Sequence, residues 1–259
     1  MTKQPNYTLL WLSIALLIIG TFVFRYNGGA VDKYLINLVY SSDAPAGERF
    51  PVGKMQPLYW LNRNDSTFTI VLSLILLGML GLGLTKKKYK ALVKYAAFGL
   101  VSFIVGPGLI VNAIFKELWG RPRPSQTVLW PNSETPDNLP FYKVWDPAFL
   151  DGMDKPAFPS GHVSVTVIYI VIFYIFKNPE TAAYLIGEFK EYKVRLFTAF
   201  KYTGLALAFP GGIIMGFARM SAGAHHPSDV FWTFGMVLLI NWVFYYYVFK
   251  IPAWEEQNK

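Results

Sequence analysis

The three histidines of this 259-residue chain are placed where they could carry out chemistry. His225 and His226 lie side by side in "RMSAGAHHPSDV", between Arg219 and Asp229 and directly before a long apolar run. His162 ends the stretch "FPSGH" and also precedes an apolar run. A carboxylate that holds one imidazole nitrogen fixes the tautomer of the ring, which prepares the ring for nucleophilic attack or proton transfer. The pattern therefore indicates a histidine-based reaction centre.

The contact between His225 and Asp229 depends on the proline between them. A separation of four residues would place both side chains on one face of a helix. Pro227, however, favours the first helical turn and would leave His225 just outside the helix. The sequence leaves both geometries open.

The sequence also contains cationic residues and a predicted helix start that could bind an anion beside the histidines. "KELWGRPRP" supplies Lys116, Arg121 and Arg123, while Ser160 and Gly161 directly precede His162. At a predicted helix start, free backbone N–H groups and the helix dipole favour an anion.

The alternative to an anion site is a metal site. The set of His162, His225, His226 and Asp229 could hold zinc. Because the neighbouring lysine and arginines would crowd the same place with positive charge, a bound oxyanion is favoured over a metal cation. We therefore expect no metal and no cofactor.

The rest of the chain has the composition of a polytopic membrane protein. Hydrophobic residues make up 53% and charged residues only 15%, too apolar for an ordinary soluble domain. The apolar residues form blocks of about 17 to 25 residues, long enough to cross a bilayer as helices. The six predicted spans are Thr8–Phe24, Thr67–Thr85, Tyr95–Phe115, Ser160–Phe176, Tyr202–Ala218 and Val230–Phe249. The predicted fold is all-α, a single membrane-embedded domain over residues 1–259 with a motif core at 116–229.

Charge distribution predicts the orientation. The linker Lys86–Lys94 holds five lysines in nine residues, which favours the cytoplasmic side for this linker and for both termini. The histidine motifs then face outward, and the N-terminal apolar segment is expected to be a retained anchor. The net charge of +8 is explained by membrane topology, so nucleic acid is not expected as a partner. The short apolar segment Tyr34–Tyr40 is expected along the membrane interface.

Taken in order, the motifs resemble the three-part signature of the type 2 phosphatidic acid phosphatase superfamily. Lys116 is followed by six residues and Arg123-Pro124, then by "PSGH" ending at His162, and then by Arg219, five residues, His225, three residues and Asp229. One departure is Ala218, where the family usually has serine.

The resemblance implies a role for each residue. His225 would attack phosphorus and form a phosphohistidine, Asp229 would orient its ring, and His162 would protonate the leaving oxygen. The phosphoryl oxygens would be held by Lys116, Arg123, Arg219, the Ser160 hydroxyl and the Gly161 N–H. Arg121 and His226 fall outside this signature. Arg121 is expected to contact a phosphate or headgroup, and His226 is open to three interpretations: a solvated residue, which is favoured, a headgroup contact, or a secondary phosphate ligand.

The expected function is that of an integral membrane lipid phosphatase of the bacterial inner membrane, acting without metal on its outer face. Lipid A 1-phosphate is the favoured substrate, with undecaprenyl diphosphate and phosphatidylglycerophosphate as alternatives. Two hypotheses of other classes are a vanadate-dependent haloperoxidase and a non-catalytic lipid-binding protein. The sequence does not indicate an oligomeric state.

Overall fold

The computed structural model describes residues 7–133, 139–146 and 156–259. The first six residues of the predicted N-terminal anchor, and two stretches of the segment between Lys116 and Pro159, lie outside the described residues. The long helices are α1 (Tyr7–Asn37), α3 (Asp65–Thr85), α4 (Ala91–Phe103) continued by η3 (Ile104–Phe115), α9 (Glu191–Ser221), and α10 (Pro227–Val243) continued by η5 (Phe244–Val248). The short ones are η1 (Pro51–Lys54), α2 (Leu58–Arg63), η2 (Lys87–Tyr89), α5 (Lys116–Trp119), η4 (Pro124–Gln126), α6 (Gly161–Val167), α7 (Ile170–Ile175), α8 (Pro179–Leu185) and α11 (Ile251–Asn258).

The all-α membrane architecture is confirmed, with one difference in the number of continuous spans. Over the described ranges, five helices are long and apolar enough to cross a bilayer. The fourth predicted span is divided into α6 and α7, and α8 follows at a bend of 73°. The six-span plan therefore holds if this bent pair is counted as one crossing.

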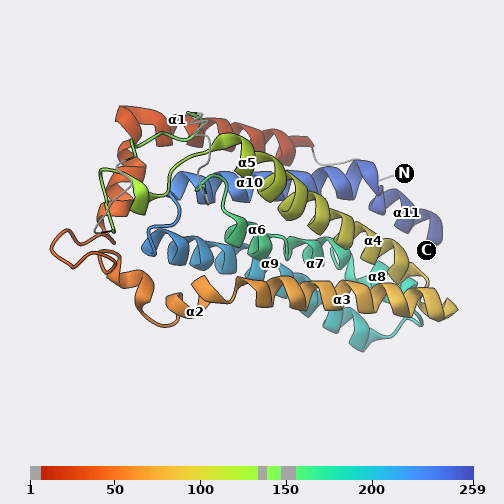
Figure 1. The fold of residues 1–259 in the computed structure, drawn as a ribbon. Coiled ribbons are helices and arrows are strands. Elements are labelled where there is room, and N and C mark those ends of the chain that lie inside the picture. The colour runs from red at the N-terminus through yellow and green to blue at the C-terminus, as the bar shows by residue number, and fades with distance from the viewer. Residues whose placement is uncertain (1–6, 134–138, 147–155) are drawn as a thin grey trace.

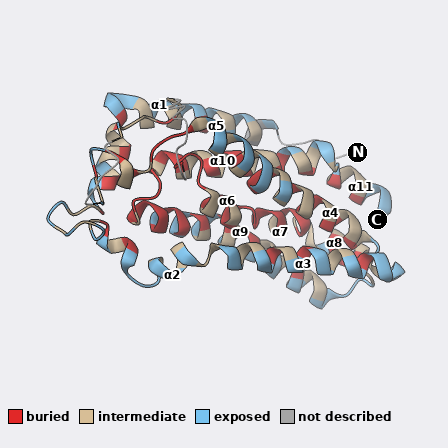
Figure 2. Cartoon of the chain, viewed as in Figure 1, coloured by how far each residue is buried: buried red, intermediate tan, exposed pale blue. Residues whose placement is uncertain are grey.

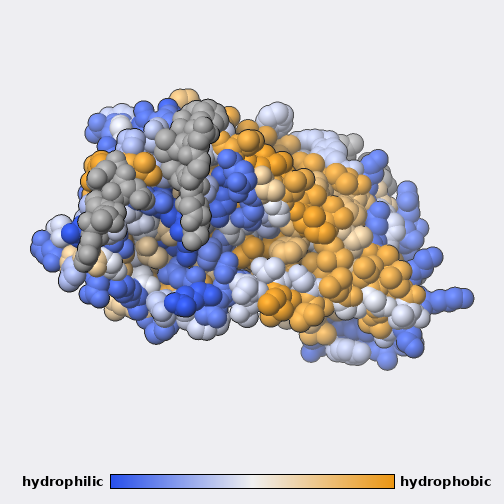
Figure 3. All heavy atoms as spheres, in the orientation of Figure 1, coloured by the Kyte–Doolittle hydropathy of each residue, from blue (hydrophilic) through white to orange (hydrophobic). Residues whose placement is uncertain are grey.

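The outer surface of the bundle matches a lipid environment. Large apolar side chains of α1 and α3 are exposed, including Phe22 at 72% and Leu84 at 69%. Figure 3 shows a hydrophobic band over the middle of the molecule with hydrophilic residues at both ends. Buried positions instead line the inward faces of α6 and α9 (Figure 2). Apolar residues on the outside are expected where lipid replaces water.

Helix α1 is longer than its predicted span because it turns. Tyr26–Gly29 leave helical geometry, with φ values of 46° at Asn27, 66° at Gly28 and 83° at Gly29. Glycine adopts this left-handed conformation without a steric penalty. Figure 1 shows the remainder of α1 running across the end of the bundle. There Ile36 and Val39 form an apolar cluster with Phe50, Trp130 and Met220.

Both chain ends lie at the opposite end of the bundle from α2 and the long loops (Figure 1). Between the two ends of the bundle, the prolines and glycines that could weaken a helix pack against neighbouring residues. Pro107 is buried in the π-helical η3, and its carbonyl accepts a hydrogen bond from Nδ2 of Asn112 at 2.7 Å. Gly212 of α9 is in close contact with Phe234 and Val167. The arrangement leaves the motif-bearing ends of α6, α9 and α10 together at one end.

Candidate active site

The predicted phosphate-binding helix start is formed by Ser160 and Gly161. Ser160 caps α6, its hydroxyl accepting from the backbone N–H of Val163 at 3.4 Å. Its own N–H donates to Oγ1 of Thr233 at 2.9 Å, which ties α6 to α10. A Cβ at Gly161 would lie only 2.6 Å from Oδ1 of Asn112. A larger residue at this position would therefore force the Asn112 side chain of η3 to move.

The structure resolves how Pro227 places His225. Pro227 begins α10, and His226 is the N-cap residue, so His225 lies outside the helix. Nδ1 of His225 is 3.9 Å from Oδ2 of Asp229, longer than a hydrogen bond. That carboxylate oxygen accepts instead from the backbone N–H of His226 at 2.8 Å. Catalytic hydrogen bonds are often long in unliganded enzymes and tighten when substrate binds, so the pair is positioned to close.

The predicted cations converge on His225. The ring is buried, with 1% of the residue exposed. Burial lowers the pKa of His225 well below its ordinary value, and the positive charges of Arg219, Arg123 and Lys116 lower it further. A charge shifts the pKa of a neighbouring group in this way only when it lies close by. The site thus combines a neutral imidazole with three cations that suit a phosphoryl group.

His162 faces two oxygen atoms that the sequence motifs do not include. Its Nε2 lies 3.3 Å from the backbone carbonyl of Asn62 and 3.4 Å from Oδ2 of Asp65. Asn62 also accepts from Nη1 of Arg219 at 3.2 Å through its Oδ1. Nε of Arg219 has no hydrogen-bond partner within the described part of the chain, which leaves a donor for substrate. Asn62 and Asp65 are therefore site residues that sequence reasoning missed.

Asp65 is expected to support His162 as a proton donor. A carboxylate beside an imidazole stabilises its protonated form. For Asp65→Asn we expect roughly a tenfold lower kcat with a lipid phosphate, since general acid catalysis contributes about 10²- to 10⁴-fold. The loss should be small with p-nitrophenyl phosphate, whose leaving group needs no proton. Phosphate release from both substrates measures this, with Asp43→Asn as the control. Equal losses on both substrates would rule the role out.

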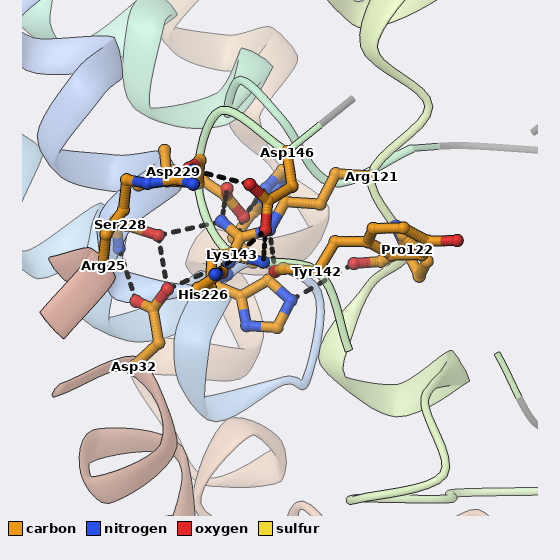
Figure 4. Close-up of polar contacts among 12 residues, drawn as sticks. Arg25, Asp32, Arg121, Pro122, Tyr142, Lys143, Asp146, His226, Ser228 and Asp229 are labelled. Carbon is orange, nitrogen blue, oxygen red and sulfur yellow. Dashed lines mark hydrogen bonds and ion pairs between the residues drawn. The ribbon is translucent and has the colours of Figure 1, made fainter. Parts of the chain in front are cut away.

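Arg121 lies inside the protein, in a buried ion-pair network (Figure 4). The guanidinium is fully buried and donates from Nη2 to Oδ2 of Asp32 at 2.9 Å, from Nη1 to Oγ of Ser228 at 2.8 Å, and from Nη1 to Asp229. Asp32 in turn accepts from the N–H of Ser228 at 2.9 Å. The buried guanidinium is therefore not placed to contact a phosphate or headgroup at the surface, contrary to the expectation from the sequence. The ion pair of Arg121 with Asp229 fixes the position of this carboxylate.

His226 is buried, so the favoured interpretation of a solvated residue is wrong. None of its surface is exposed. Its Nε2 lies 3.2 Å from the carbonyl of Pro122, and its ring packs against Phe141 and Trp130, with centroids 5.4 and 6.0 Å away. The contacts of this ring are therefore with a backbone carbonyl and two aromatic side chains. Across the described ranges, no three histidine, aspartate or glutamate side chains are grouped to hold a metal.

Burial of His225 and His226 in neutral form predicts a pH-dependent stability. Burial, together with nearby cations, lowers the pKa of both rings well below the ordinary value. Below about pH 6.5 the unfolded chain then binds more protons than the folded chain, so the free energy of unfolding decreases as pH falls. We expect the Tm in detergent to fall between pH 7.5 and 5.5. His226→Gln should reduce this fall, and an unchanged pH dependence in that variant would contradict the explanation.

Comparisons with known proteins agree with the geometry. Residues 95–253 match the PAP2 superfamily, a region that contains every predicted motif residue but not Asp32, Asn62 or Asp65. A lipid A 4'-phosphatase of Francisella tularensis subsp. novicida (strain U112) is 30% identical over 197 residues, covering 74% of this chain and 75% of the relative. No solved structure matches the chain significantly. With its motif residues assembled at one end of a membrane-spanning helical bundle, the chain belongs to the PAP2 superfamily and is a lipid phosphatase.

Proposed function

We propose that the protein removes the 4'-phosphate of lipid A at the outer face of a bacterial inner membrane. The observation that carries the chemistry is the buried ring of His225 beside Asp229, near enough to Arg219, Arg123 and Lys116 for their charges to lower its pKa. The name of the relative favours the 4'-position. We therefore propose the 4'-phosphate in place of the 1-phosphate that the sequence suggested. The whole chain acts as one membrane-embedded domain.

The reaction runs in two steps. In the first, Nε2 of His225 attacks phosphorus, the bond to the sugar oxygen breaks, and His162 gives its proton to that oxygen. In the second, His162 takes a proton from water, the hydroxide attacks phosphorus, and the phosphorus–nitrogen bond breaks to release phosphate. When substrate binding closes the 3.9 Å gap to Nδ1 of His225, Asp229 holds the proton on this nitrogen. The cations stabilise the equatorial oxygens of the transition state, which is the main task in phosphoryl transfer.

Charge supports the proposed orientation. The lysine-rich linker around η2 joins α3 to α4 at the same end as the chain termini (Figure 1). Lysine-rich short loops stay in the cytoplasm. The active site at the other end then faces the periplasm or the cell exterior.

The test is phosphate release by the purified protein from lipid A, undecaprenyl diphosphate, phosphatidylglycerophosphate and phosphatidic acid, with and without chelator. We expect lipid A to be the best substrate, with a product that keeps its 1-phosphate in mass spectra and a rate that chelator leaves unchanged. A product that keeps the 4'-phosphate instead would assign the enzyme to the 1-position. Faster release from undecaprenyl diphosphate would favour that alternative substrate, and loss of activity with chelator would restore the metal hypothesis.

A further inference from the structure

A second cationic cavity lies beside the active site. It has a volume of about 190 Å³, and its lining includes Phe50, Lys54, Tyr59, Asn62, Arg63 and Asn132. A water occupies about 30 Å³ in the liquid, so the cavity has room for a phosphate group and part of a sugar. We propose that this cavity binds a second phosphate of the substrate headgroup. The proposal rests on the function above: with the 4'-phosphate at His225, the 1-phosphate of lipid A would lie at Lys54 and Arg63.

Asn62 connects the cavity to the catalytic centre. The side chain lines the cavity, while its Oδ1 accepts from Arg219 and its backbone carbonyl faces His162. A headgroup whose first phosphate is held by Arg219 therefore extends past Asn62 into the cavity. Asn62 is thus shared by the cavity and the catalytic centre.

The position of Lys54 relative to Arg219 is fixed by close backbone packing. A Cβ at Gly53 would lie 2.5 Å from the carbonyl oxygen of Ser221 and 2.7 Å from the backbone of Ala222. The loop that carries Lys54 thus packs directly on the end of α9, two residues beyond Arg219. A fixed distance between two cationic sites suits a rigid disaccharide with a phosphate on each sugar.

Both cations can exchange their present contacts for an anion. Arg63 donates to the hydroxyl of Tyr59 at 3.0 Å, a neutral partner. Lys54 lies 3.6 Å from Glu48, and these two side chains are 52% and 63% exposed. Exposed pairs of this kind contribute little stability, whereas charge-assisted bonds to phosphate are among the strongest in proteins.

The proposal is tested with Lys54→Gln/Arg63→Gln on two substrates, bisphosphorylated lipid A and the monophosphorylated form that carries only the 4'-phosphate. We expect the KM for the bisphosphorylated lipid to rise about tenfold, as for the loss of charge-assisted hydrogen bonds, with kcat within about twofold. The KM for the monophosphorylated lipid should stay near its wild-type value. Lys33→Gln/Lys143→Gln removes the same charge at the same end of the molecule, outside the cavity, and should leave both substrates unaffected.

Two outcomes would overturn the proposal. Equal KM changes on both substrates would mean that Lys54 and Arg63 act by general attraction, and no change would mean that they do not bind substrate. If lipid A is not hydrolysed at all, the proposed function fails separately. In that case the test is inhibition of phosphatidic acid hydrolysis by each form of lipid A. The bisphosphorylated form should inhibit the wild type more tightly than the monophosphorylated form, and this difference should be lost in the double variant. Equal inhibition of the wild type by both forms would reject the cavity as a phosphate site.

Discussion

His225→Ala is expected to lower kcat for phosphate release by about 10⁴-fold, as for loss of the nucleophile in other covalent mechanisms. The ring stands among three cations and next to Asp229, and no other described imidazole occupies this position. Steady-state phosphate release measures the loss. Rapid acid-free quenching with a ³²P-labelled lipid phosphate should trap labelled protein for the wild type and none for the variant.

The neighbouring histidine is the matched control. His226→Gln replaces an imidazole next to His225 in sequence, but this side chain faces Pro122 and Phe141. We expect its kcat to stay within about tenfold of wild type, as for a residue that acts only through packing. Full activity in His225→Ala, or an equal loss in both variants, would contradict the assignment of the nucleophile.

Arg121→Met is expected to destabilise the protein by about 3–5 kcal/mol, the cost of breaking a buried ion pair by removing one partner. Asp32 and Asp229 are both fully buried and both bonded to this guanidinium. Without it, two carboxylates would face each other without a compensating charge. Thermal unfolding in detergent measures the loss, and kcat should fall as well, because Asp229 would no longer be held beside His225.

Two further variants separate this explanation from a simple loss of charge. Arg25→Met breaks a partly exposed pair, whose side chains are 33% and 29% exposed, and should cost no more than about 1 kcal/mol. Adding Asp32→Asn to Arg121→Met should recover part of the stability, because one of the unpaired carboxylates is removed. Equal destabilisation by Arg25→Met and Arg121→Met would show that the buried network is not the cause.

The helices were predictable because the requirement to cross a bilayer imposes length and apolarity on the sequence. The departures have local causes. The first span continues to Asn37 because Asn27, Gly28 and Gly29 allow a turn that keeps the chain helical on both sides. The fourth span is divided after Val167, where the helical hydrogen bonding of α6 ends and α7 starts at Ile170. Apolar content alone does not distinguish a continuous helix from two short ones.

Part of the site was predictable from motif spacing, and part was not. The spacing predicted that His225 and the cations would come together, and the structure brings them near one another. The spacing could not show which environment each side chain faces. His225 and His226 are consecutive, but their side chains lie in different environments. Helix α10 begins at Pro227, so His226 is its N-cap residue and His225 precedes the helix. Asp32 and Asp65 are single acidic residues far from the motifs in sequence. Only their position at the outer ends of the first and second predicted spans could have drawn attention to them.

The network around Arg121 can be completed only late in the synthesis of the protein. Its members come from the beginning, middle and end of the chain: Asp32, then Arg121, then Ser228 and Asp229. Asp32 and Arg121 are translated long before α10, so both are present while Ser228 and Asp229 are still missing from the chain. The ion pair between Arg121 and Asp229 forms only when α10 arrives, in the same event that brings in His225. A ribosome-bound chain that ends before Pro227 is therefore expected to hold Arg121 and Asp32 without their partners Ser228 and Asp229, and to be a target for quality-control proteases.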